Sequence, residues 1–170
     1  MATRVKPLPV RGAADSTSGP TAECSAADAP ASIWREWALA SDLSLIEPVV
    51  QTIVALCRTA GYSARHCNLN VPVAITEALA NAMLRGNRSE TARSVHVSMT
   101  LDAQSLRVEV TDEGGGFDLS ALQQSPDEAD WLEREDGRGV FLMRTLMDRV
   151  ESASPDAHTG HCIRLILHRT

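Results

Sequence analysis

A helix predicted over residues 71–84 constrains the fold of this chain more than any other feature. Ile75, Leu79 and Met83 recur at every fourth residue, so they form one apolar stripe along the helix. Alanines beside the stripe allow close packing, and such a stripe must be covered by another layer of structure. The Gly-Asn pair at 86–87 is expected to end the helix in a left-handed turn.

Strand patterns and two further helical patterns surround this helix. Alternating apolar and polar residues predict strands at 33–38, 95–101, 106–110, 150–153 and 163–168. The second and third of these strands are expected to form a hairpin. Apolar residues at helical spacing predict helices over 49–60, which Gly61 ends, and 140–147. This order predicts an α+β fold, in which helices cover one face of a mixed, mostly antiparallel sheet.

Length and composition limit the number of domains and the classes of partner. With 170 residues, 44% of them hydrophobic, the chain can build one ordinary domain. Residues 1–32 are poor in large apolar side chains, so we expect a flexible tail followed by a domain over 33–170. The net charge of -6 argues against direct nucleic-acid binding. Without a signal peptide or membrane-length apolar run, a cytoplasmic protein with reduced cysteines and no membrane partner is expected.

Two polar side chains on the predicted helix are candidates for a site. Glu77 and Asn81 are one turn apart and project from the same face, beside the apolar stripe. A carboxylate can accept a proton from a hydroxyl, and an amide oxygen can coordinate Mg²⁺. The alternative is that the pair forms only a polar helix edge.

A polar, glycine-rich segment follows the strand at 106–110. Asp112 at the strand end could accept a hydrogen bond from an exocyclic amine, and Gly114 and Gly116 would let the backbone approach a ligand. A tight turn would explain the same residues. The segment continues to Gly139, and loops of that length inside compact domains are usually lids or disordered insertions, of which we expect a lid.

A second glycine-flanked sequence, at 136–139, precedes the helix expected from Val140. Free N–H groups and the positive end of a helix dipole suit phosphate, and Arg138 adds a fixed charge. Alone this pattern is weak. It becomes informative because it follows Glu77, Asn81 and Asp112 in the chain, and each of these motifs lies on the type of structure that a ligand site would need.

Together these motifs resemble the N, G1 and G2 boxes of the GHKL (HATPase_c) ATPases, most closely those of the anti-sigma-factor serine/threonine kinases (RsbW-like). The resemblance covers about 33–168. The matching stretches read Glu77-Ala-Leu-Ala-Asn81-Ala with Gly86-Asn87, then Asp112-x-Gly114-x-Gly116-Phe117, then Gly137-Arg138-Gly139-x-x-Leu142-Met143.

The resemblance implies a Bergerat-type two-layer α/β sandwich with an ATP lid, and it implies roles for single residues. Asn81 would bind Mg²⁺, Asp112 the adenine amine, and Glu77 would be the catalytic carboxylate. The other positions implied to contact ATP are Arg85, Gly114, Gly116, Gly137, Arg138, Gly139 and Val140, and Arg138 would also offset charge during transfer. Arg85 stands where the family often has His, and Gly160-His161 where it often has Gly-Thr.

Several reactions share these boxes. We expect neither the phosphoacceptor hairpin of a histidine kinase before residue 33 nor a transducing domain after residue 168. The leading hypothesis is a serine/threonine protein kinase that phosphorylates a STAS-domain anti-anti-sigma antagonist, with a sigma factor as competing partner. The alternative is a non-catalytic ATP-binding module that sequesters a sigma factor or another regulator. The resemblance also implies a homodimer, in which Trp34 and Trp37 would provide contact area unless they belong to the core edge.

Overall fold

The computed structural model describes residues 32–114, 135–153 and 160–169 of the chain. Within these residues one sheet has five strands in the order β1-β2-β3-β5-β4, and each neighbouring pair is antiparallel. The strands are β1 (Ile33–Ala40), β2 (Ser94–Leu101), β3 (Ser105–Asp112), β4 (Arg149–Ala153) and β5 (Cys162–His168). The expected hairpin is confirmed as β2 and β3.

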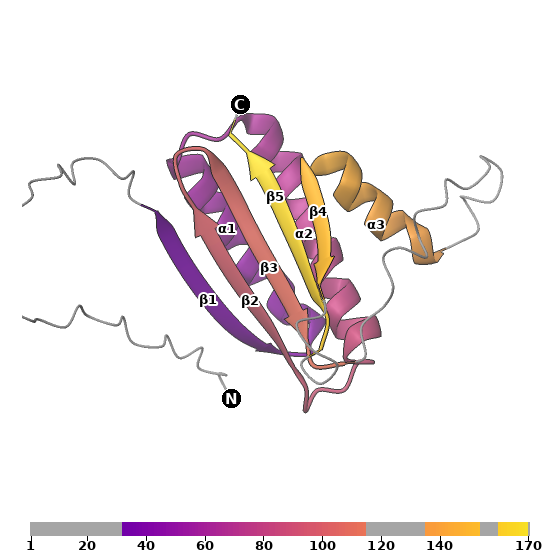
Figure 1. Cartoon of the computed structure of the whole chain (residues 1–170). Coiled ribbons are helices and arrows are strands. Elements are labelled where there is room, and N and C mark those ends of the chain that lie inside the picture. The colour runs from indigo at the N-terminus through magenta and orange to yellow at the C-terminus, as the bar shows by residue number, and fades with distance from the viewer. Residues whose placement is uncertain (1–31, 115–134, 154–159, 170) are drawn as a thin grey trace, which may run out of the picture.

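Helices cover one face of this sheet (Figure 1). Helices α1 (Ile46–Thr59) and α2 (Val71–Asn81) lie behind it in the view of Figure 1, and α3 (Glu135–Leu146) packs against α2 close to β4. Two wide helical turns, η2 (His66–Asn70) and η3 (Ala82–Gly86), continue α2 at its two ends. The α+β sandwich expected from the order of elements is confirmed.

The hydrophobic core lies between the helices and the sheet. The stripe residues Ile75, Leu79 and Met83 are at most 1% exposed, and they share one core cluster with Val97 and Met99 of β2. Burying a side chain of this size stabilises the fold by about 1.5–3 kcal/mol. The stripe therefore fixes the rotation of α2 about its axis, and with it the direction of Glu77 and Asn81.

The two tryptophans of edge strand β1 have different surroundings. Trp34 is 56% exposed, whereas Trp37 is partly buried and packs against the core. Trp37 is thus a core-edge residue, and Trp34 is the one that offers apolar surface to solvent.

The end of the α2 region differs from the prediction. The left-handed conformation falls at Arg88 (φ 54°) and Ser89 (φ 58°), whereas Asn87 is right-handed with φ -85°. The wide final turn causes the shift, because the N–H of Asn87 donates to the carbonyl of Ala82 at 2.8 Å. The chain therefore leaves the helix two residues later than expected.

Other boundaries also differ. Helix α1 begins at Ile46, before the expected residue 49, and helical structure begins before residue 71, so His66 lies in a helical turn. No helix in the described part of the chain is long and apolar enough to cross a membrane. Apart from residue 32, the expected tail lies outside the described residues, as do residues 115–134 of the expected lid.

Candidate functional site

Three glycines bring three chain segments into contact around Asp112, at the end of β3. A β-carbon on Gly86 would overlap the Asp112 carboxyl group, and one on Gly114 would overlap the Gly86 carbonyl. A β-carbon on Gly160, where φ is 82°, would overlap the Asp112 carbonyl. Glycine is therefore required at each position for close approach, and at Gly160 also for its conformation.

The carboxyl group of Asp112 is buried but remains hydrogen-bonded. Asp112 is 2% exposed, its Oδ1 accepts the N–H of Gly114 at 2.9 Å, and its own N–H donates to the His161 carbonyl at 3.0 Å. Burial raises the pKa of this carboxyl, while the Gly114 N–H and the charges of His161 and Arg93 oppose that rise. A buried acceptor of this kind suits an amine donor on a ligand.

A second group of predicted residues meets where α3 crosses α2. A β-carbon on Gly139 would lie 2.5 Å from Glu77 Oε2 and 3.3 Å from Asn81 Nδ2. Glu77 and Asn81 are both partly buried, and Arg138 beside Gly139 is exposed. The structure thus brings Glu77, Asn81 and Gly139 together where α3 packs against α2.

The sequence at 136–139 does not precede a helix, as was expected, but lies inside one. Helix α3 begins at Glu135, and Val140 is 2% exposed within it. A helix leaves only the N–H groups of its first turn free, so Gly137 lies among such groups, whereas Gly139 and Val140 lie beyond them.

The oxygen donors on α2 fit a magnesium ion. Mg²⁺ prefers oxygen ligands, retains several waters and is usually held by one or two protein groups together with phosphates. The amide of Asn81 and the carboxylate of Glu77 supply such oxygens from adjacent turns. The described residues contain no cluster of three or more His, Cys, Asp or Glu side chains that could hold a metal ion.

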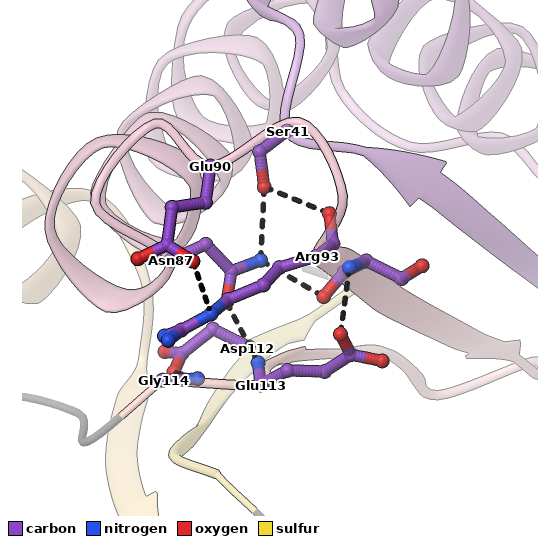
Figure 2. Close-up of polar contacts among 8 residues, drawn as sticks. Ser41, Asn87, Glu90, Arg93, Asp112, Glu113 and Gly114 are labelled. Carbon is purple, nitrogen blue, oxygen red and sulfur yellow. Dashed lines mark hydrogen bonds and ion pairs between the residues drawn. The ribbon is translucent and has the colours of Figure 1, made fainter.

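Asn87 is a site residue that the sequence pattern does not reveal. Its side chain is fully buried; Nδ2 donates to Ser41 Oγ and to the Ser94 carbonyl, and Oδ1 accepts the N–H of Glu113, all at 2.9 Å (Figure 2). Every partner comes from a different segment of the chain. The sequence placed Gly86-Asn87 at the helix end and within the N-box resemblance, but it predicted no contact for the Asn87 side chain.

The remaining predicted positions have less defined surroundings. Arg85 lies exposed in the last turn of η3, and Gly116 lies outside the described residues. His161, which replaces the Thr of the resembled family, is 5% exposed, and its Nε2 lies 2.5 Å from Ser152 Oγ. His161 therefore lies next to Asp112 through its backbone, with its ring held in place by β4.

Comparison with known proteins agrees with this geometry. Residues 39–167 match the histidine kinase-like ATPase domain family. The chain is 32% identical over 90 residues to the serine-protein kinase RsbW of Bacillus velezensis, and 28% identical over 87 residues to that of Oceanobacillus iheyensis. The two matches cover 50% and 48% of this chain, and 56% and 55% of the respective relatives. The chain therefore spans about half the length of the curated relatives that it matches.

Proposed function

This chain belongs to the histidine kinase-like ATPase domain family, and we propose that it is an ATP-dependent serine/threonine protein kinase of the anti-sigma type. The observation that carries the proposal is the contact of Gly139 with both Glu77 and Asn81. It brings a carboxylate, a magnesium-type ligand and the N-terminal half of α3 to one place. The similarity to two RsbW serine-protein kinases supports the same reaction class.

One helix connects the proposed phosphate and base positions. Gly86 lies five positions after Asn81 and nine after Glu77, and the last five positions form the wide turn η3, so the α-helical rise of 1.5 Å per residue gives upper limits of about 8 Å and about 14 Å along the axis. That span is comparable with an extended nucleoside triphosphate. We therefore place the base at Asp112, Gly114 and Gly116, and the phosphates near Gly137, Arg138 and Gly139, with Arg85 and Val140 at the margin.

The proposed roles follow from the side-chain chemistry. Asn81 would hold Mg²⁺, which when bound neutralises charge on the phosphates. Arg138, an exposed guanidinium, would offset charge on the transferred group. Glu77 would orient the acceptor hydroxyl and take its proton as the hydroxyl oxygen bonds to the γ-phosphorus and the β–γ bridging bond breaks, releasing ADP.

The proposed acceptor is a serine or threonine of a STAS-domain anti-anti-sigma antagonist, and a sigma factor or another regulator would compete with it for this protein. The support is the similarity to RsbW kinases together with Glu77. A module that only binds and sequesters a regulator needs a nucleotide pocket but no carboxylate at the phosphate end.

Phosphate transfer from γ-labelled ATP to a candidate STAS antagonist tests this function. We expect the wild type to label the antagonist and Glu77→Gln to lose at least about 100-fold in rate, since positioned general bases contribute about that much. Glu47→Gln, which changes an exposed carboxylate on α1, is the matched control and should match the wild type. ATP binding without transfer by the wild type would instead support the sequestering module, and absence of ATP binding would refute both.

A further inference from the structure

Asn87 connects the end of the α2 region to the segment that follows β3. Its Oδ1 accepts the N–H of Glu113, which is the first backbone donor after Asp112. Its Nδ2 donates to Ser94 at the start of β2 and to Ser41 after β1. Figure 2 shows these bonds converging on the side-chain amide of Asn87.

These contacts immobilise Asp112 from both sides. On the chain's N-terminal side, the N–H of Asp112 itself donates to the His161 carbonyl next to β5. On the C-terminal side, the next N–H donates to Asn87, and the one after it, from Gly114, donates to the Asp112 carboxyl. Three consecutive N–H groups are thus satisfied, and only the middle one depends on a side chain from another element.

Further hydrogen bonds connect the segments that Asn87 contacts. The Oε2 atom of Glu113 accepts the N–H of Ser94 at 2.9 Å, while the Ser94 carbonyl accepts from Asn87. Ser41 Oγ in turn donates to the Arg93 carbonyl at 3.1 Å. Because all amide atoms of Asn87 have partners and its side chain is 0% exposed, this is a satisfied buried network, which rigidifies its surroundings.

We propose that Asn87 is a positioning residue for base recognition, which acts by holding the Glu113 peptide so that the Asp112 carboxyl stays directed at the exocyclic amine of adenine. The inference rests on the proposed function, because it requires Asp112 to contact the base. A purely structural role would stabilise the fold without affecting which base is bound.

The test compares binding of ATP and of inosine triphosphate, which carries a carbonyl in place of the amine, by calorimetry in the presence of Mg²⁺. We expect the wild type to prefer ATP. Asn87→Ala should weaken ATP binding about tenfold, in keeping with the loss of a buried hydrogen-bonded group, and should change inosine triphosphate binding less than about twofold. The ratio of the two affinities therefore falls towards one.

Two further variants separate positioning from general destabilisation. Ser41→Ala removes one bond of Asn87 on the side away from Glu113, so it should lower Tm but keep the preference for ATP. Asn87→Asp retains an acceptor for the Glu113 N–H and should keep most of the preference, and it provides the measurement if Asn87→Ala does not fold. Binding is measured below the Tm of each variant.

Each outcome has a distinct meaning. If Asn87→Ala lost the same affinity for both nucleotides, so that the affinity ratio did not change, the positioning role would be overturned. Loss of the preference for ATP in Asn87→Asp would overturn it as well. Either result would leave the kinase function intact. If the wild type bound neither nucleotide, the proposed function itself would fail, and the role of Asn87 with it.

Discussion

Glu77 on α2 and Gly139 on α3 are so close that a β-carbon on Gly139 would reach within 2.5 Å of the Glu77 carboxylate oxygen Oε2. The crossing of the two helices thus occurs at the proposed catalytic carboxylate. Any side chain at 139 must displace that carboxylate, since the carboxylate is the more flexible of the two groups.

Gly139→Ala should therefore affect stability and activity in opposite directions. Alanine in a helix interior is favoured over glycine by about 0.8–1.0 kcal/mol, so we expect Tm to be maintained or raised. Displacement of the Glu77 carboxylate should lower kcat at least about tenfold, because catalytic geometry tolerates little misplacement. Thermal unfolding and steady-state phosphorylation on the same preparation measure both effects. Equal activity in the variant and the wild type would contradict the proposed role of this contact.

Asn81→Ala should lose magnesium-dependent ATP binding while the protein remains folded, because Asn81 is partly buried and lies outside the hydrophobic core cluster. Calorimetric titrations with magnesium and with a chelator should give the same weak affinity for the variant. Asn68→Ala is a suitable control, since Asn68 is exposed in η2, the turn before α2, where its Oδ1 accepts a hydrogen bond from Arg58 of α1. Unchanged magnesium-dependent affinity in Asn81→Ala would count directly against its assignment as the metal ligand.

Asp112→Asn should stabilise the ligand-free protein at neutral pH and weaken its preference for adenine. Burial raises the pKa of Asp112, so the folded state binds a proton more tightly than the unfolded state. Stability contributed by this group is therefore greatest below its unfolded pKa and falls as the pH rises through the raised folded pKa. The gain in Tm of the variant should accordingly shrink as the pH is lowered. A gain that does not vary with pH would exclude a buried carboxylate as its cause.

Trp34→Ser should weaken self-association if the protein forms the proposed homodimer through β1. Trp34 is 56% exposed on an edge strand, and loss of such a side chain from the centre of an interface typically weakens binding by at least about tenfold. Light scattering over a range of concentrations gives the mass of each species. Trp37→Phe, which changes a residue packed against the core, is expected to affect Tm more than association.

The residues predicted well are those whose role depends on local periodicity. The stripe of Ile75 and Leu79 and the alternation in β2 both place one face of an element against the core, so the α+β fold and the common direction of Glu77 and Asn81 could be derived from spacing alone. The start of α3 could not, because glycines at 137 and 139 oppose a helix locally.

The Asn87 network shows a different limit. Its partners Ser41, Ser94 and Glu113 lie up to 46 residues away in the chain, and only the assembled sheet brings them to one amide. Gly86 is similar, since the reason for glycine there is contact with the Asp112 carboxyl and not backbone conformation. Such roles arise from tertiary contacts and leave no periodic signal.

The strand order also has a consequence for folding during synthesis. Strand β5 comes last among the described strands, yet it lies between β3 and β4 in the sheet. Until it leaves the ribosome, β3 has one unpaired edge and β4 has no neighbour. Pairings between distant segments form slowly. We therefore expect nascent chains truncated before Cys162 to be sensitive to proteases, and longer chains that contain β5 to be resistant.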